Sequence, residues 1–153
     1  MNKKGQAAME FLMTYGWAIL VVLIAIGALS YFGVLSPEKF LPEKCVISSG
    51  SGLFCNEFTS SSSAETVTIR LKNILTESAW VDSISMDSPS CSFSTANTKV
   101  GSDNTTDFSL GCSGGLTKGD KIKGTLTIVY DVGSTAGEGL SKSTTGQLVT
   151  VVP

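Results

Sequence analysis

The hydrophobic and polar positions divide the chain into two parts with different periodicities. From Phe11 to Pro37 no residue is charged, and the part up to Leu35 is nearly all apolar. Beyond residue 66 the pattern alternates between apolar and polar positions, most regularly in 67–72 and 122–132. A long continuous apolar run predicts a helix, and strict alternation predicts half-buried β-strands. We therefore expect an α+β protein.

The apolar run is long enough to cross a membrane as a helix. At about 1.5 Å per residue it spans roughly 37 Å, compared with about 30 Å for a bilayer core. The apolar region of a secretory signal peptide is shorter, about 7 to 15 residues. On hydropathy alone an ordinary signal anchor remains an equal alternative. Because Pro37 disfavours the α conformation at Ser36, we predict that the helix ends near Leu35.

The alternating part predicts an antiparallel, immunoglobulin-like β-sandwich over residues 67–153. Shorter strands are expected at 79–86, 91–94, 106–110 and 147–152, which makes six or seven strands without a helical pattern. Residues 36–66 contain Pro37 and Pro42 and a Ser/Gly-rich stretch, so we assign them to a linker and a stapled loop. Trp80 is predicted in the core, with an exposed contact for sugars as the alternative.

Composition excludes several classes of function. The 153 residues carry a net charge of −2 and no basic cluster longer than Lys3-Lys4, so nucleic-acid binding is not expected. The absence of histidine removes the commonest general base and metal ligand. We therefore expect no enzyme activity, no metal and no cofactor.

The four cysteines, all beyond the apolar run, lack the C-x-x-C spacing of zinc and dithiol redox sites. Three disulfide pairings are possible. We favour Cys45 with Cys55 and Cys91 with Cys112, because sequence neighbours close the shorter loops. Lys3 and Lys4 precede the helix and the cysteines follow it, so the N-terminus is expected in the cytoplasm and the remainder outside.

Two features at the start of the helix need an explanation. A small residue, Gly5, separates the lysines from the helix just before Gln6, where a protease could cut and leave the helix intact. Glu10 stands at the head of the apolar run, where a carboxylate costs on the order of 2 to 3 kcal/mol and needs a partner or a functional reason. The alternative is that Glu10 lies at headgroup level and interacts favourably with the helix dipole.

These features resemble the type IV pilins, most closely archaeal pilins with a class III signal peptide. The resemblance covers the sequence Lys3-Lys4-Gly5-Gln6-Ala7-Ala8-Met9-Glu10-Phe11-Leu12 and the apolar residues 13–20. It implies that a prepilin peptidase cuts between Gly5 and Gln6, so that 1–5 is a leader. It also implies that 6–35 is transmembrane before assembly and forms the filament core afterwards, with Glu10 paired to the Gln6 amino group of a neighbouring subunit. Archaeal pilins commonly carry a β-sandwich head.

The leading hypothesis is a pilin of an archaeal type IV pilus-like filament at the cell surface, with a role in adhesion. Its partners would be copies of itself, the prepilin peptidase, the assembly machinery and, before assembly, the membrane. Alternatives are an archaellin, which the Met9-Glu10-Phe11-Leu12 context disfavours, and an unpolymerised membrane-anchored sandwich that binds a sugar or peptide. Asn104 begins the N-x-[ST] sequon Asn104-Thr105-Thr106, a potential glycosylation site.

Overall fold

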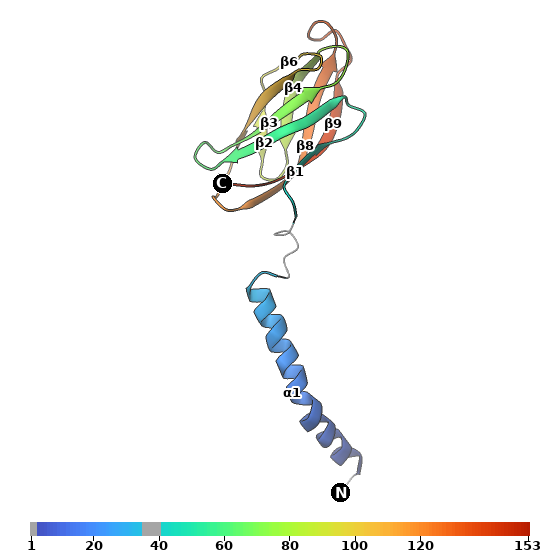
Figure 1. Cartoon of the computed structure of the whole chain (residues 1–153), viewed down its shortest axis with the longest axis vertical. Coiled ribbons are helices and arrows are strands. Elements are labelled where there is room, and N and C mark those ends of the chain that lie inside the picture. Colours follow the sequence, from blue (N-terminus) through green and yellow to red (C-terminus); the bar gives the residue numbers. More distant parts are fainter. Residues whose placement is uncertain (1–2, 35–40) are drawn as a thin grey trace. The chain divides into compact units, whose positions relative to one another are not determined.

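The computed structural model of this chain describes residues 3–34 and 41–153. The chain divides between Phe40 and Leu41 into two compact units, an N-terminal helix and a β-domain (Figure 1). The α+β class, with one long apolar helix followed by an antiparallel β-domain, is confirmed.

Helix α1 spans Lys3–Tyr31 and ends earlier than the sequence suggested. Gly33 adopts φ 69°, and the Val34 N–H donates to the Leu29 carbonyl at 3.1 Å. This left-handed glycine with a six-residue hydrogen-bonded turn is a Schellman motif, which terminates helices. The predicted end near Leu35 is therefore too late, because Gly33 stops the helix before the proline; the Ser36-Pro37 signal lies outside the described residues.

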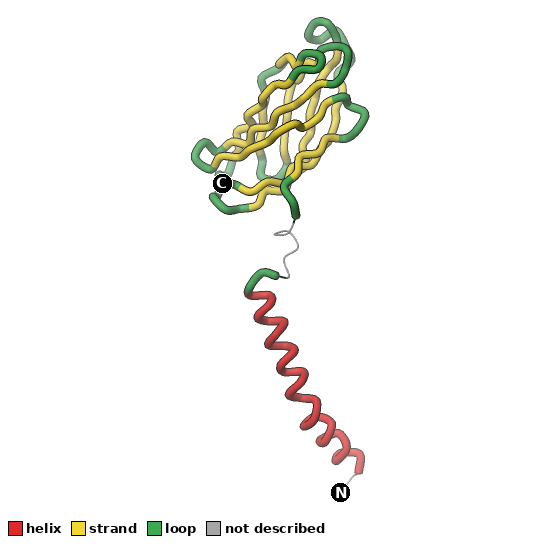
Figure 2. Tube along the Cα trace, in the orientation of Figure 1, coloured by secondary structure: helices red, strands yellow, loops and turns green. Residues whose placement is uncertain are grey.

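The β-domain contains nine strands among its described residues, all paired antiparallel. They are β1 (Lys44–Ile47), β2 (Leu53–Ser61), β3 (Thr66–Asn73), β4 (Ala79–Met86), β5 (Cys91–Phe93), β6 (Thr98–Val100), β7 (Thr105–Cys112), β8 (Lys121–Val132) and β9 (Lys142–Val151). The order is β1-β9-β8-β4-β5-β7-β3-β2, and β6 pairs with β4. This sheet folds over into two layers and makes a nearly closed sandwich (Figure 2).

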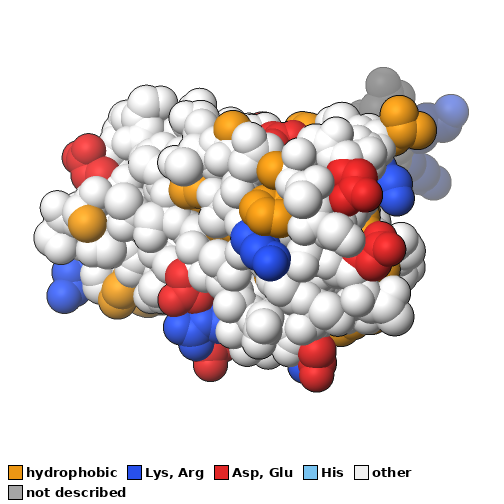
Figure 3. All heavy atoms as spheres, turned by 90° about the horizontal axis from the view of Figure 1, so that it is seen from above, with side chains coloured by type: hydrophobic (Ala, Val, Ile, Leu, Met, Phe, Trp, Pro, Cys, Tyr) orange, Lys and Arg blue, Asp and Glu red, His pale blue; other side chains and the backbone are white. Residues whose placement is uncertain are grey.

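The core lies between the layers and follows the predicted alternation. Every second residue is buried along β3, and the same alternation holds in β8 as far as Tyr130. The largest fully buried side chains include Phe108, Leu53, Ile69, Leu71, Ile84, Leu110, Leu126, Ile128 and Leu148. On the face of the domain seen in Figure 3, hydrophobic side chains appear as small separate spots among backbone atoms and other side chains. The domain therefore buries its own apolar surface.

The chain enters the sandwich at one end, and three connecting loops lie together at the other end. At one end, where the chain enters, the Lys121 ammonium at the start of β8 donates to the Leu41 carbonyl. At the other end, where β8 finishes, the loops 74–78, 101–104 and 133–141 are joined by hydrogen bonds. The Gly133 N–H donates to the Ser78 carbonyl at 3.1 Å, and the Ser102 hydroxyl donates to the Leu75 carbonyl at 2.6 Å.

Two expectations about this domain need correction. Residues 44–47 and 53–61, assigned to a linker and stapled loop, form β1 and β2, so the domain begins near Leu41. The alternation in β2 is obscured because it is a solvent-facing edge strand with a register shift between Cys55 and Glu57. Trp80 is not in the core: its neighbours Ala79 and Val81 take the inward positions, which turns Trp80 to the outer face of β4.

Candidate functional site

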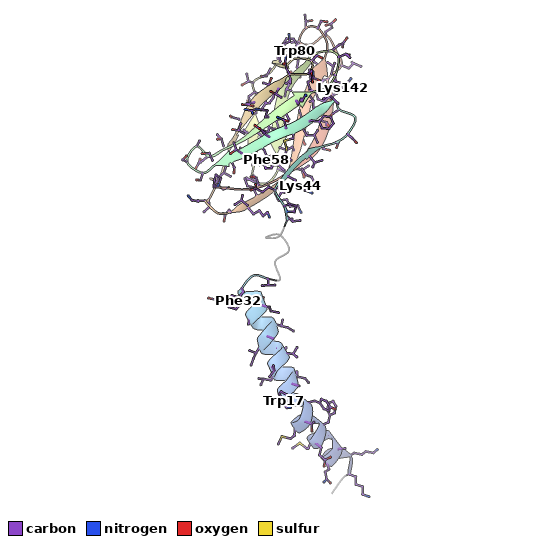
Figure 4. All side chains as sticks on the ribbon, viewed as in Figure 1. Trp17, Phe32, Lys44, Phe58, Trp80 and Lys142 are labelled. Carbon is purple, nitrogen blue, oxygen red and sulfur yellow. A yellow bond between two sulfur atoms is a disulfide. The ribbon has the colours of Figure 1, made fainter. Side chains whose placement is uncertain are left out.

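The surface of α1 is the most unusual feature of the chain. None of its residues is buried, and large apolar side chains project on all sides, including Trp17, which is 67% exposed. Trp17, and Phe32 just beyond the helix, extend away from the ribbon in Figure 4. A helix that is apolar all round requires a lipid or protein environment.

By length and composition α1 can cross a membrane, with a mean hydropathy of 2.3 over its most apolar 18-residue window. A signal sequence near an N-terminus meets the same criterion. The helix is therefore suited to be a signal or an anchor.

The proposed processing residues lie in the first turns of α1. Gly5 and Gln6 are both exposed, and a Cβ placed on Gly5 would meet no atom within 4 Å. A larger residue at position 5 therefore clashes with no described part of the chain. Lys3 and Lys4 precede the junction on the same helix.

Glu10 is exposed two turns into α1. The Thr14 hydroxyl donates to the Glu10 backbone carbonyl at 2.8 Å, and the rings of Phe11 and Tyr15, one turn apart, lie with their centroids 4.8 Å apart and their planes tilted by 38°. Within residues 3–34 and 41–153 the Glu10 carboxylate forms no ion pair. It is thus an unpaired acid at the start of an apolar surface.

The two disulfides have the pairing that the loop-length argument favoured. Cys45–Cys55 joins β1 to β2 with Cα atoms 5.8 Å apart, and both residues are half-buried. Cys91–Cys112 joins register partners in β5 and β7, and both residues are buried. Disulfides persist in oxidising compartments, so the β-domain is suited to an extracytoplasmic location.

Asn104 lies in an exposed turn immediately before β7. Its backbone N–H donates to the Gly101 carbonyl at 3.1 Å, and its own carbonyl accepts from the Asn73 N–H at 3.0 Å. The Thr106 hydroxyl of the sequon donates to the Lys99 carbonyl at 3.1 Å. The sequon is therefore accessible but fixed in its backbone conformation.

An ion-pair network on the outer face of β2, β3 and β7 was not foreseen from the sequence. The Arg70 guanidinium donates to both carboxylate oxygens of Asp107, at 2.5 and 2.9 Å, and also contacts Glu57. Hydrogen bonding from Arg70 lowers the pKa of Asp107, and the two carboxylates raise the pKa of Arg70. The period-two spacing puts Arg70 and Asp107 on outward faces, but only the β3–β7 register brings them together.

Trp80 is an aromatic side chain on the outer face of β4, where a ligand such as a sugar could contact its ring. The indole N–H donates to the Gly133 carbonyl at 3.0 Å, and the Lys99 ammonium lies 5.4 Å from the ring centroid. Trp80 lies on the β-domain, as labelled in Figure 4. The ring is half-buried and held by both contacts, so it is a fixed surface group.

Surface hollows on the β-domain are open. One of about 310 Å³ crosses the outer face of β1, β9 and β8. It is lined by Lys44, Val46, Ser48, Thr125, Thr145, Gly146 and Gln147.

Among the described residues, no three His, Cys, Asp or Glu side chains gather closely enough to hold a metal ion.

Comparison of this chain with models of known protein families found no match, and comparison with curated proteins found none either.

Proposed function

We propose that the chain is a pilin, a non-enzymatic structural subunit of an archaeal type IV pilus-like surface filament. After removal of 1–5, the subunits polymerise through the N-terminal helix and present the β-domain to the solvent for attachment to surfaces. The observation that carries this proposal is the order Gly5-Gln6, Glu10 and an apolar helix without a buried side chain.

The exposure of α1 supports polymerisation because a filament core gives every side of the helix a partner. A bilayer covers this surface before assembly, and the helices of neighbouring copies replace the lipid afterwards. A Cβ placed on Gly16 or on Gly27 would meet no atom within 4 Å, so both positions offer room for a neighbouring backbone to approach closely.

Glu10 supports the same proposal through electrostatics. A lone carboxylate is costly in an apolar environment, whereas pairing with a cation offsets part of that cost. Cleavage before Gln6 creates an α-amino group four residues from Glu10, and in a neighbouring copy this group supplies the cation. The pair then fixes the axial register between subunits.

The test is the N-terminal mass of protein recovered from cell-surface shear fractions. Wild type is expected to begin at Gln6 and to be found in filaments. Gly5→Val is expected to remain uncut in the membrane. Gly16→Val, the same substitution at another open helix position, is the matched control; it is expected to be cut normally, and the N-terminal mass of both variants is read in the membrane fraction.

A second measurement separates processing from assembly. Glu10→Gln is expected to be cut at Gly5 but to be lost from the shear fraction, because the neutral amide cannot pair with the amino group. Glu77→Gln, at an exposed position on the β-domain, serves as the control. A wild type that begins at Met1 or Asn2 and stays membrane-bound contradicts the pilin proposal and supports an anchored binding domain.

A further inference from the structure

Strand β9 pairs with β8 on one side, and a short segment, residues 43–48, covers its other side. We call this segment the edge cap. Its ladder to β9 runs from Lys44 opposite Val149 to Ile47 opposite Gly146. Hydrogen bonds extend this cover at both ends. The Ser48 N–H donates to the Thr145 carbonyl at 2.8 Å, and the Glu43 carboxylate accepts from the Val151 N–H at 2.8 Å. The edge cap therefore covers the β9 edge from Thr145 to Val151.

The covered strand has the composition of a self-pairing segment. Residues 144–152 contain no charge and no proline, and they are rich in Thr and Val. Short uncharged segments with high β-propensity pair readily with identical strands when an edge is exposed. Leu148 and Val149 are fully buried in the intact domain. Without the edge cap, β9 presents a strand edge that a second copy of this chain can extend.

The edge cap is a short segment at one end of the strand order. Strand β1 has four residues, and in the described sheet it stands at one end of the strand order while β2 stands at the other. Ile47 packs into the core, and Gly146 allows a close approach, since a Cβ there would lie 2.5 Å from the Val46 carbonyl oxygen. The Cys45–Cys55 bond joins the edge cap to β2, which has a long ladder to β3.

We propose that the Cys45–Cys55 disulfide is a clasp that keeps the edge cap on β9 and so blocks strand pairing between copies of this chain. When this bond is absent, or when an added dithiol reduces it to two thiols and is itself oxidised to a disulfide, 43–48 is released and the β9 edge becomes a binding surface for a second copy. This inference goes beyond the proposed function and does not depend on filament formation.

The second disulfide provides a matched control. Cys91 and Cys112 already face each other in the β5–β7 register, within the buried part of the domain. Loss of this bond lowers stability without uncovering β9. The variant pair is therefore Cys45→Ser with Cys55→Ser, compared with Cys91→Ser with Cys112→Ser.

The experiment uses the full chain at one copy per lipid nanodisc, so that helices in different discs cannot meet. Hydrogen exchange in the clasp variant is expected to increase at 44–48 and at Val151 by up to about 100-fold, the effect of opening a loop of about ten residues. Protection in β3 and β8 should fall much less, which shows that the domain is still folded. Sedimentation should show concentration-dependent pairing of discs for the clasp variant and not for the control.

A third variant tests whether the pairing uses β9. Gln147 is exposed on β9. Adding Gln147→Lys to the clasp variant is expected to abolish disc pairing while 44–48 still exchanges rapidly, because charges on an edge strand oppose pairing. If the clasp variant does not fold, reduction of folded wild type by dithiothreitol followed by alkylation opens the half-buried Cys45–Cys55 before the buried Cys91–Cys112.

Three results overturn the proposal. The first is equal protection of 44–48 in the clasp variant and the control. The second is discs that stay single although 44–48 has lost protection. The third is discs of the clasp variant that pair equally well with Gln147→Lys present.

Discussion

The helix and the β-domain use apolar residues in opposite ways. In the β-domain every second residue of the main strands is turned inward, and side chains such as Phe108 lose all contact with solvent. In α1 apolar residues occupy every side, and none is buried. The β-domain therefore supplies its own apolar environment, whereas α1 needs one from lipid or from other chains. Substitutions of one residue type should thus have different consequences in the two units.

The largest expected effect is in the core of the β-domain. Phe108→Ala removes a fully buried ring that packs edge-to-face on Phe93 at 5.1 Å, and it should lower the free energy of unfolding by about 3 to 5 kcal/mol. Phe54→Ala, at a side chain that is 49% exposed, should change it by less than about 1 kcal/mol. Denaturant unfolding of the full chain in nanodiscs measures both. Equal effects would contradict the assigned core.

The complementary change is a charge in α1. Ile24→Asp should make membrane insertion less favourable by about 2.5 to 3.5 kcal/mol and leave the stability of the β-domain unchanged. Ile74→Asp is the control, because Ile74 is also more than half exposed but lies on the β-domain. Carbonate extraction of membranes reports the insertion of each variant. Normal insertion of Ile24→Asp would show that α1 is not in contact with lipid.

A smaller effect is expected where a glycine allows close packing. A Cβ on Gly124 would lie 2.6 Å from the Ser88 carbonyl oxygen and 2.5 Å from Met86 Cγ, so Gly124→Ala should cost about 1 to 3 kcal/mol. Gly111→Ala, with no atom within 4 Å of the added Cβ, is the matched substitution and should be nearly neutral. Thermal unfolding distinguishes them, and a neutral Gly124→Ala would contradict this packing.

The smallest effect concerns pH and the Arg70 network. Asp107 has a pKa below its ordinary 3.8, so its contribution to stability is complete above about pH 4 and is lost as pH falls below that value. Asp107→Asn should therefore lower the urea midpoint slightly near neutral pH and should flatten its decline in acid. Asp82→Asn is the control, since Asp82 forms no ion pair within the described residues. A parallel acid decline in wild type and Asp107→Asn would exclude this contribution.

The sequence predicted correctly those elements that show a clear pattern of apolar and polar residues along their own length. The apolar run predicted α1, and period-two alternation placed β3, β4 and β8 to within one residue. The shortest-loop argument found both disulfides. It could not show that Cys45–Cys55 joins the two ends of the strand order, because that order depends on contacts distant in sequence.

Elements with weak patterns were missed for identifiable reasons. β2 is an edge strand whose exposed face and register shift hide its alternation, and β6 has only three residues. Trp80 was assigned to the core by residue type, although the small neighbours Ala79 and Val81 already indicated the inward face of β4. The position of Glu10 in an apolar run could be read from the sequence, but the Arg70 network required the pairing of β2, β3 and β7.

The loops at the end of β8 have a practical consequence for variation in this protein. Residues 74–78, 101–104 and 133–141 lie at the opposite end of the sandwich from Leu41. Their side chains include the highly exposed Leu140. Hydrogen bonds join these loops to one another and to the buried side chains of Asn73 and Asp131, which fix the ends of the loops. Insertions there need not disturb strand pairing. This rim is accordingly the place where the chain can diverge in sequence, or accept a foreign epitope, while keeping its architecture.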